Sequence, residues 1–151
     1  MILRMMPEAF SRQWDNLKLH IAKSLPKDEC SEQTLTNILE GVLKNQIMCW
    51  ISYDSQNDNQ VNFVFLLEPL NDPFKQERNL LVYTITRMEK LDQTTTIRMY
   101  REGYVALQKF MKKAGYSKLI GYIDEDNYGL VKRAKEFGSK LRWHWALNME
   151  G

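Results

Sequence analysis

The chain has 151 residues, enough to bury one sizeable core, and we expect a single domain over 1–151. Its net charge of +2, with basic and acidic residues interspersed, excludes an obvious nucleic-acid or membrane-surface partner. No run approaches the roughly 18 apolar residues that cross a bilayer, and the start lacks the long apolar segment of a signal peptide. We therefore expect a cytoplasmic chain whose cysteines, Cys30 and Cys49, are reduced.

The first 45 residues predict a short strand and two helices. Ile2–Met5 is apolar enough for a strand, and Pro7 then suits the first turn of a helix because its missing N–H is not needed there. Ser31 is a suitable N-cap for a second helix, in SEQTLTNILEGVLKN. The first helix is expected to continue to Pro26, because apolar residues recur at helical spacing at Phe10, Trp14, Leu17 and Ile21.

Three segments rich in strand-forming residues follow. Ile47–Tyr53 and Val61–Pro69 are separated by the polar segment DSQNDNQ, which predicts a hairpin. We expect a loop at NDPFKQER before the next strand, Asn79–Met88. The uninterrupted apolar run of this third strand indicates that both of its faces are covered.

The last third of the chain predicts strand, loop, helix, strand, helix, strand. We expect a loop at EKLDQTTTIR and a helix from about Met99 to Ala114, which Gly115 ends. KLIGYI predicts a buried strand, YGLVKRAKEF a helix, and LRWHWALNM an alternating final strand. A helix that returns the chain to a parallel neighbouring strand forms a βαβ unit, and the mouth of such a unit is a common ligand site.

The element order predicts an α/β fold with a mixed, mostly antiparallel central sheet, helices on both faces and a parallel βαβ cleft. This order resembles the GNAT superfamily, the GCN5-related N-acetyltransferases, across nearly the whole chain. Asn127, Leu130 and Gly138 stand at the spacing of a motif at the family's fourth helix, and Gly115 also stands where the family usually has a glycine. The first two helices are similar to those of small GNAT-like proteins encoded by bacteriophages. The resemblance implies that the βαβ cleft holds acetyl-CoA.

The sequence departs from the family pattern in the loop that binds the pyrophosphate of acetyl-CoA. The family uses Arg/Gln-x-x-Gly-x-Gly/Ala, whose glycines let backbone N–H groups approach the phosphates at a helix N-terminus. The corresponding positions lie near Thr95, Arg98 and Tyr100, and Gly103 lies one turn later. Thr95 and Thr96 still offer hydroxyls, and Arg98 offers charge. The resemblance therefore implies a degenerate pyrophosphate-binding loop.

Other site residues are also implied by the resemblance. Glu68 lies near where some members hold a general base that takes a proton from the acceptor amine; the alternative is an ordinary solvated glutamate at a strand end. Tyr83 and Thr84 would lend backbone groups to pantetheine, although their side chains suit packing, and Asn127 would belong to the cofactor site. Ala134 stands where a tyrosine often protonates the departing CoA thiolate, and alanine has no proton to give.

Two functional hypotheses follow. The first is an acyl-CoA-dependent N-acetyltransferase that uses acetyl-CoA and acts on an unknown small-molecule or protein amine by direct transfer, with positioning as the main catalytic term. The second is a catalytically inactive GNAT-fold binding or structural protein, encoded by a bacteriophage, with an assembly partner in the virion or the host cytoplasm. The overall pattern favours the first hypothesis, whereas the missing glycines and Ala134 favour the second. We expect no metal, nucleic-acid or membrane partner.

Overall fold

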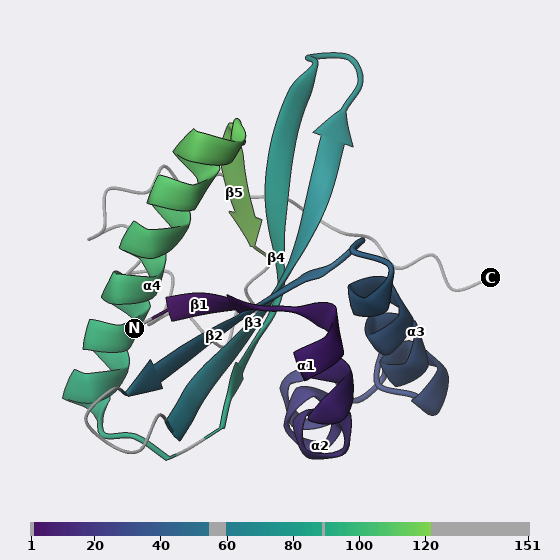
Figure 1. The fold of residues 1–151 in the computed structure, drawn as a ribbon, viewed down its shortest axis with the longest axis vertical. Coiled ribbons are helices and arrows are strands. Elements are labelled where there is room, and N and C mark those ends of the chain that lie inside the picture. Colours follow the sequence, from purple (N-terminus) through teal and green to yellow (C-terminus); the bar gives the residue numbers. More distant parts are fainter. Residues whose placement is uncertain (1, 55–59, 89, 122–151) are drawn as a thin grey trace.

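The computed structural model describes residues 2–54, 60–88 and 90–121. Within them, the strands form one five-stranded sheet in the order β1-β2-β3-β4-β5 (Figure 1). The strand pairs are antiparallel except β4 and β5, which run parallel. The elements are β1 (Ile2–Met5), α1 (Pro7–Arg12), α2 (Trp14–Ser24), α3 (Glu32–Leu43), β2 (Met48–Asp54), β3 (Gln60–Asp72), β4 (Glu77–Arg87), α4 (Gln93–Ala114) and β5 (Lys118–Gly121).

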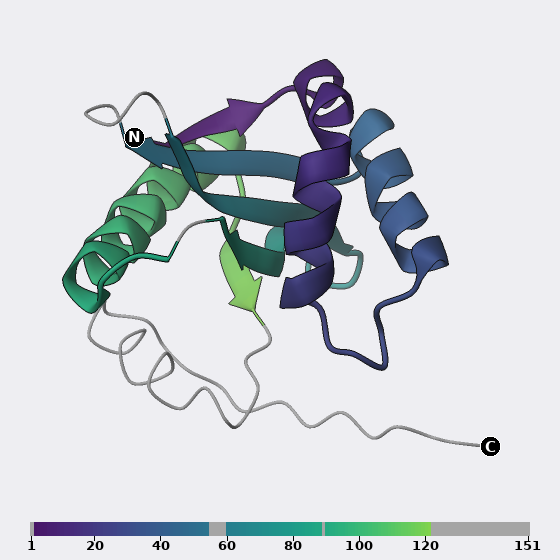
Figure 2. The ribbon, with the colours of Figure 1, turned by 90° about the horizontal axis from the view of Figure 1, so that it is seen from below.

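Helices cover both faces of the sheet. Helices α1, α2 and α3 lie on one face and α4 lies on the other, as Figures 1 and 2 show. Helix α4 connects β4 to the parallel strand β5, which completes a βαβ unit. The predicted fold class is therefore confirmed. The second predicted helix of this region, the final strand and the Asn127–Gly138 motif lie outside the described residues.

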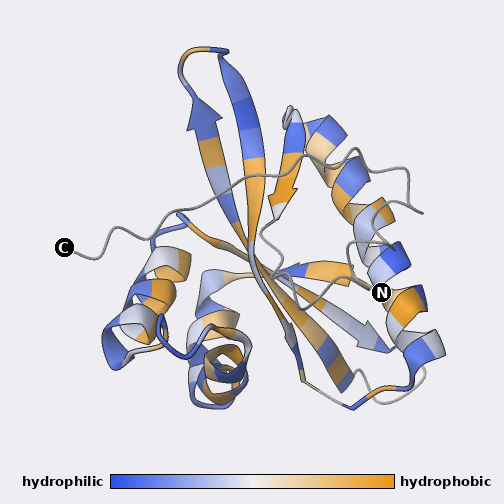
Figure 3. Ribbon diagram, turned by 180° about the vertical axis from the view of Figure 1, so that it is seen from behind, coloured by the Kyte–Doolittle hydropathy of each residue, from blue (hydrophilic) through white to orange (hydrophobic). Residues whose placement is uncertain are grey.

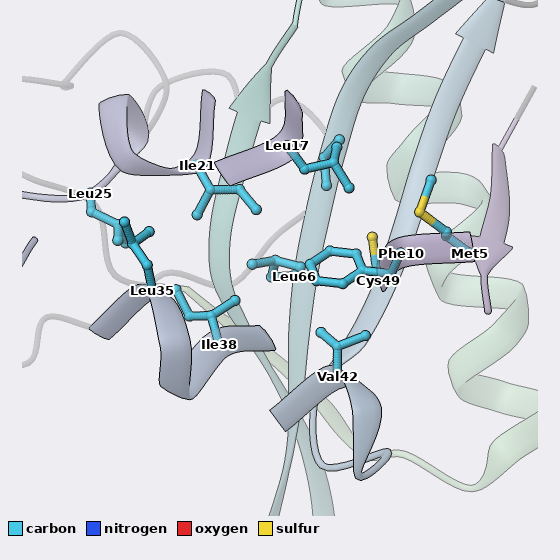
Figure 4. Packing of buried hydrophobic residues seen from close by; sticks show 11 residues of the cluster. Met5, Phe10, Leu17, Ile21, Leu25, Leu35, Ile38, Val42, Cys49 and Leu66 are labelled. Atoms are coloured by element: carbon cyan, nitrogen blue, oxygen red, sulfur yellow. The ribbon is translucent and has the colours of Figure 1, made fainter. Parts of the chain in front are cut away.

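Each face of the sheet has its own hydrophobic cluster. Alternate residues of a strand point to opposite faces, so neighbouring residues such as Cys49 and Met48 belong to different clusters. The middle of the sheet is largely hydrophobic, whereas the projecting part of β3 and β4 is largely hydrophilic (Figure 3). The cluster under α1–α3 is drawn in Figure 4 and contains Met5, Phe10, Leu17, Ile21, Leu25, Leu35, Ile38, Val42, Cys49, Val64 and Leu66. The cluster under α4 contains Met48, Phe63, Phe65, Leu67, Leu80, Met99, Leu107 and Met111.

The first predicted helix is in fact two helices. Gln13 has φ −100° and ψ 6°, and it ends α1 and precedes α2. The backbone N–H of Gln13 donates to Ala9 O and Phe10 O, both at 3.2 Å, so this N–H remains hydrogen-bonded where the chain turns. Phe10 and Leu17, on either side of the turn, are both buried against the sheet. No glycine or proline stands at the turn, so no helix-breaking residue marks it in the sequence.

The loop predicted at NDPFKQER is shorter than expected. Strand β3 runs to Asp72 and β4 begins at Glu77, so only residues 73–76 form the turn. One carboxylate oxygen of Asp72 accepts from the backbone N–H groups of Phe74 at 3.0 Å and Lys75 at 3.2 Å, which closes the turn locally. The two long strands project beyond the rest of the sheet (Figure 1).

Arg78 fixes the junction between α4 and β5. Its guanidinium donates to Ala114 O at 3.2 Å and to the Tyr116 hydroxyl at 3.3 Å, and it lies 4.7 Å from the centroid of the Tyr116 ring. Gly115 ends α4 in the left-handed conformation at φ 77°, as predicted. Lys118 at the start of β5 forms a 2.8 Å ion pair with Glu77. Side-chain interactions as well as strand pairing therefore stabilise the junction between α4 and β5.

Candidate functional site

Strand β4 contains a β-bulge at Tyr83. Leu66 of β3 lies opposite Thr84, whereas the next residue, Leu67, lies opposite Val82. Tyr83 is therefore the extra residue, and it has no counterpart across the β3–β4 ladder. A bulge leaves the extra residue unpaired and bends the strand, and bulges are common next to active sites.

The parallel pairing of β4 with β5 ends at the same place. Among the described residues it runs from Asn79 opposite Lys118 to Val82 opposite Gly121. Strand β4 continues to Arg87, so the edge that faces away from β3 has no strand partner from Tyr83 onward within the described part of the chain. Backbone N–H and C=O groups on a strand edge of this kind can pair with an extended ligand, as a sheet edge accepts an added strand. We call this edge, from Tyr83 to Arg87, the β4 edge.

Acidic side chains influence the phenol at the bulge. Tyr83 is 39% exposed. Burial raises the pKa of Tyr83 above its ordinary value, and the charges of Glu29 and Glu68 raise this pKa further. The phenol therefore keeps its proton at neutral pH. Glu29 lies in the turn between α2 and α3 and Glu68 lies in β3, so the carboxylates near the bulge come from two separate parts of the chain.

A cluster of three hydroxyls joins α2 to β4 beside the bulge. Ser24 donates to Ile21 O at 2.7 Å, and its oxygen lies 2.9 Å from the hydroxyls of both Thr84 and Thr86. Because Ser24 has one proton, Thr84 and Thr86 must donate to it. The Thr84 side chain therefore has a packing and bonding role, and its backbone is the part left for a ligand.

The segment predicted as a phosphate-binding loop is the start of α4. The helix begins at Gln93 rather than near Met99, with Asp92 as its N-cap. One oxygen of the Asp92 carboxylate accepts from the Thr95 N–H at 2.8 Å, and the other accepts from the Thr95 hydroxyl at 2.7 Å. The Asp92 carbonyl accepts from the Thr96 N–H at 3.0 Å and from the Thr96 hydroxyl at 2.8 Å. These bonds explain why a run of threonines, which favours strands and loops, is helical here.

The structure brings some of the predicted site residues together and separates others. Glu68, Tyr83 and Thr84 gather at the bulge, whereas Thr95, Thr96 and Arg98 lie in the first two turns of α4. Arg98 is exposed. Asn127 lies outside the described residues. Sequence reasoning missed Asp92, although aspartate is a favoured N-cap residue at a helix start.

Gly103 packs against the sheet. It is buried in α4, and a Cβ at this position would lie 3.2 Å from Ile2 Cδ1 and 3.6 Å from Phe65 Cζ. The absence of a side chain therefore lets α4 approach β1 and β3 closely. This contact gives the glycine a packing role.

A separate pocket of about 330 Å³ lies beside α2. The lining residues share no member with the predicted site, and they are Gln13, Asn16, Leu17, His20, Gln60, Val61 and Met88. Within residues 2–54, 60–88 and 90–121, no group of three or more His, Cys, Asp or Glu side chains could hold a metal ion. None of the helices in these ranges is both long and apolar enough to cross a membrane.

Solved structures of acetyltransferases share this fold. A probable acetyltransferase superimposes with a TM-score of 0.76 at 10% identity, covering 100% of this chain and 99% of that one. The aminoglycoside antibiotic 6'-N-acetyltransferase AAC(6')-Ih from Acinetobacter baumannii gives 0.70 at 8% identity, covering 100% and 97%. The fold is GNAT-like. No protein-family model matches the chain, and no curated protein matches it.

One further neighbour was solved with a ligand. The aminoglycoside acetyltransferase AAC(6')-Iy, in complex with the bisubstrate analogue CoA-S-monomethyl-acetylneamine, gives a TM-score of 0.71 at 10% identity and covers 100% of this chain and 97% of that one. At this level of identity the likeness establishes the fold alone. The similarity to bacteriophage proteins stays a prediction.

Proposed function

We propose that this chain is an N-acetyltransferase that moves an acyl group from a pantetheine thioester, as in acetyl-CoA, to an amine. The observation that carries the proposal is the β4 edge, where the bulge at Tyr83 coincides with the end of β4–β5 pairing at Val82 and Gly121. The likeness to acetyltransferases of known structure supports the same activity.

The β4 edge suits the pantetheine arm of the donor. Pantetheine carries two amides along an extended chain, and a strand edge offers alternating donors and acceptors at matching intervals. In this proposal Tyr83 and Thr84 lend backbone groups to the arm, and the thioester lies near the bulge. Holding the thioester and the amine together supplies much of the rate enhancement, because it replaces a bimolecular encounter with an oriented contact.

Glu68 is the proposed general base. The neutral amine nitrogen attacks the thioester carbonyl, a C–N bond forms, and the C–S bond breaks with release of the thiolate. The proton lost by the amine passes to the Glu68 carboxylate, and the thiolate takes a proton from solvent. Glu29 and Glu68 both lie near the bulge, where two carboxylates would favour binding of a cationic amine, which loses one proton to solvent before its neutral nitrogen attacks.

A second candidate function is a catalytically inactive binding protein of GNAT fold with a protein partner. The observation that favours it is the N-terminus of α4, where Asp92 already accepts the hydrogen bonds of Thr95 and Thr96. A pyrophosphate fits poorly at an N-terminus that a carboxylate already caps. The two candidates differ in whether any pantetheine thioester binds.

Calorimetric titration of the full chain with acetyl-CoA, CoA and acetyl-pantetheine tests the proposal. Binding of at least one thioester, followed by mass-spectrometric detection of an acetylated product in a panel of polyamines, aminoglycosides and lysine peptides, supports acetyl transfer. If none of the three binds at millimolar concentration, the acetyltransferase proposal is overturned and the inactive binding protein is favoured.

A further inference from the structure

We infer that this chain recognises its acyl donor by the pantetheine arm and not by the pyrophosphate, because the Asp92 carboxylate takes the place of a phosphate at the N-terminus of α4. The inference rests on the proposed acetyl transfer and narrows its donor. The donor class is an acyl thioester of pantetheine, for which a nucleotide adds little affinity.

The first argument concerns hydrogen-bond donors. A phosphate oxygen can only accept, so a helix N-terminus binds it through free N–H and O–H groups. At α4 the N–H and hydroxyl protons of Thr95 both point to the Asp92 carboxylate, and those of Thr96 both point to the Asp92 carbonyl. A hydroxyl has one proton, so these side chains have none left for a phosphate.

The second argument concerns charge. Hydrogen bonds from the backbone and side chain of Thr95 lower the pKa of Asp92 below its ordinary value, so this carboxylate is ionised at neutral pH. A pyrophosphate placed at the same helix end would face that negative charge at short range. The helix dipole that favours an anion there is already matched by Asp92.

The nearby cations do not restore a phosphate site. Arg87, Lys90 and Arg98 stand within six residues of Asp92 in sequence, and all three are exposed. Exposed charges attract an anion weakly and are screened by salt, and they do not supply the oriented backbone donors that a pyrophosphate cradle needs. We therefore expect them to add a salt-dependent and modest preference for CoA.

The bond chemistry does not require the nucleotide. The bond that breaks is the C–S bond of the thioester, and the same thiolate leaves from acetyl-pantetheine as from acetyl-CoA. In the proposed function the β4 edge binds the pantetheine arm, which both donors share. Loss of pyrophosphate recognition therefore changes which donors bind without changing the transfer step.

Calorimetry of the full chain with CoA and with pantetheine at physiological salt tests the inference. We expect the two dissociation constants to differ by less than about tenfold, whereas a working pyrophosphate cradle with several charge-assisted hydrogen bonds gives a larger ratio. We also expect Asp92→Asn to tighten CoA binding by about two- to threefold, because the lost like charge is exposed and screened by salt, and to leave pantetheine binding unchanged.

Matched controls separate the possible failures. Asparagine caps a helix as well as aspartate does, so Asp92→Asn keeps α4 intact. Asp15→Asn makes the same change of charge in the first turn of α2 and should alter neither affinity. If the unaltered chain binds CoA at least about tenfold more tightly than pantetheine, the inference is overturned while the proposed function stands. Failure of both compounds to bind either the unaltered chain or Asp92→Asn overturns the proposed function as well.

Discussion

The hydroxyl oxygen of Ser24 lies 2.9 Å from that of Thr86, which joins the end of α2 to β4 three residues beyond the bulge. Ser24→Ala would leave the buried hydroxyls of Thr84 and Thr86 without an acceptor. We expect a loss of about 1–3 kcal/mol in the free energy of unfolding, measured by urea denaturation. Thr36→Ala removes an exposed hydroxyl that bonds within its own helix and serves as the control. Equal free energies of unfolding for Ser24→Ala and Thr36→Ala would show that the hydroxyl cluster does not stabilise the fold.

Glu68→Gln tests the general base. The amide cannot take a proton, so kcat should fall by about 10²–10⁴-fold while the dissociation constant of the thioester stays the same. Steady-state assays that detect the released thiol, together with calorimetry, measure both quantities. Glu40→Gln makes the same chemical change on the exposed side of α3 and should leave both unchanged. Normal turnover in Glu68→Gln would remove Glu68 from the mechanism.

Substitutions at Gly103 test the close approach of α4 to the sheet. Gly103→Ala should be close to neutral, because the gain of about 1 kcal/mol in helix propensity offsets a 3.2 Å contact that the terminal methyl of Ile2 can relieve. Gly103→Leu should cost about 1–3 kcal/mol by overpacking. Val105→Leu, at an exposed position of the same helix, is the control. Guanidinium denaturation measures all three, and a stable Gly103→Leu variant would refute the contact.

The two cysteines should differ in reactivity. Burial raises the pKa of Cys49 from 9.0 to about 12, whereas Cys30 is half-buried. At pH 8 a disulfide reagent should modify one thiol in the native chain and two in urea, because the thiolate is the reactive form. Cys30→Ser should leave no reactive native thiol. Rapid modification of native Cys30→Ser would show that Cys49 is accessible.

The Asp92 cap predicts a pH dependence of stability. The pKa of Asp92 is lowered in the folded chain by its bonds to Thr95, so the folded state binds a proton less readily than the unfolded state. The stabilisation is therefore present above the unfolded value of 3.8 and is lost as the pH falls through the lowered value. The melting temperature should drop more steeply below pH 4 in the unaltered chain than in Asp92→Asn. If the melting temperatures of the unaltered chain and of Asp92→Asn fall equally below pH 4, the Asp92 carboxylate does not stabilise the helix as predicted.

Most of the described fold follows from local pattern. The apolar runs of β2, β3 and β4 and the cap at Ser31 were visible in the sequence, and the side chain of Ser31 does accept from the Thr34 N–H. The start of α4 was predicted too late, because three consecutive threonines favour extended structure, whereas here the hydroxyls of Thr95 and Thr96 donate to Asp92. The turn at Gln13 was missed because no turn residue marks it, and the residues buried on either side of it, Phe10 and Leu17, keep helical spacing.

The candidate site was less accessible to sequence reasoning. Glu68, Tyr83 and Thr84 were selected by resemblance, and the structure places them near one bulge. The bulge depends on the register between β3 and β4, which is a long-range property with no composition signal. The bonds of Thr84 and Thr86 to Ser24 join residues about 60 positions apart and could not be predicted from spacing.

The two hydrophobic clusters, one on each face of the sheet, share no side chain. Substitutions in the cluster under α1–α3 therefore replace none of the side chains that pack α4 against the sheet. Such a division allows the residues of one cluster to change while the other cluster keeps its packing. It is a physical reason why chains at about 10% identity retain this architecture over their whole length.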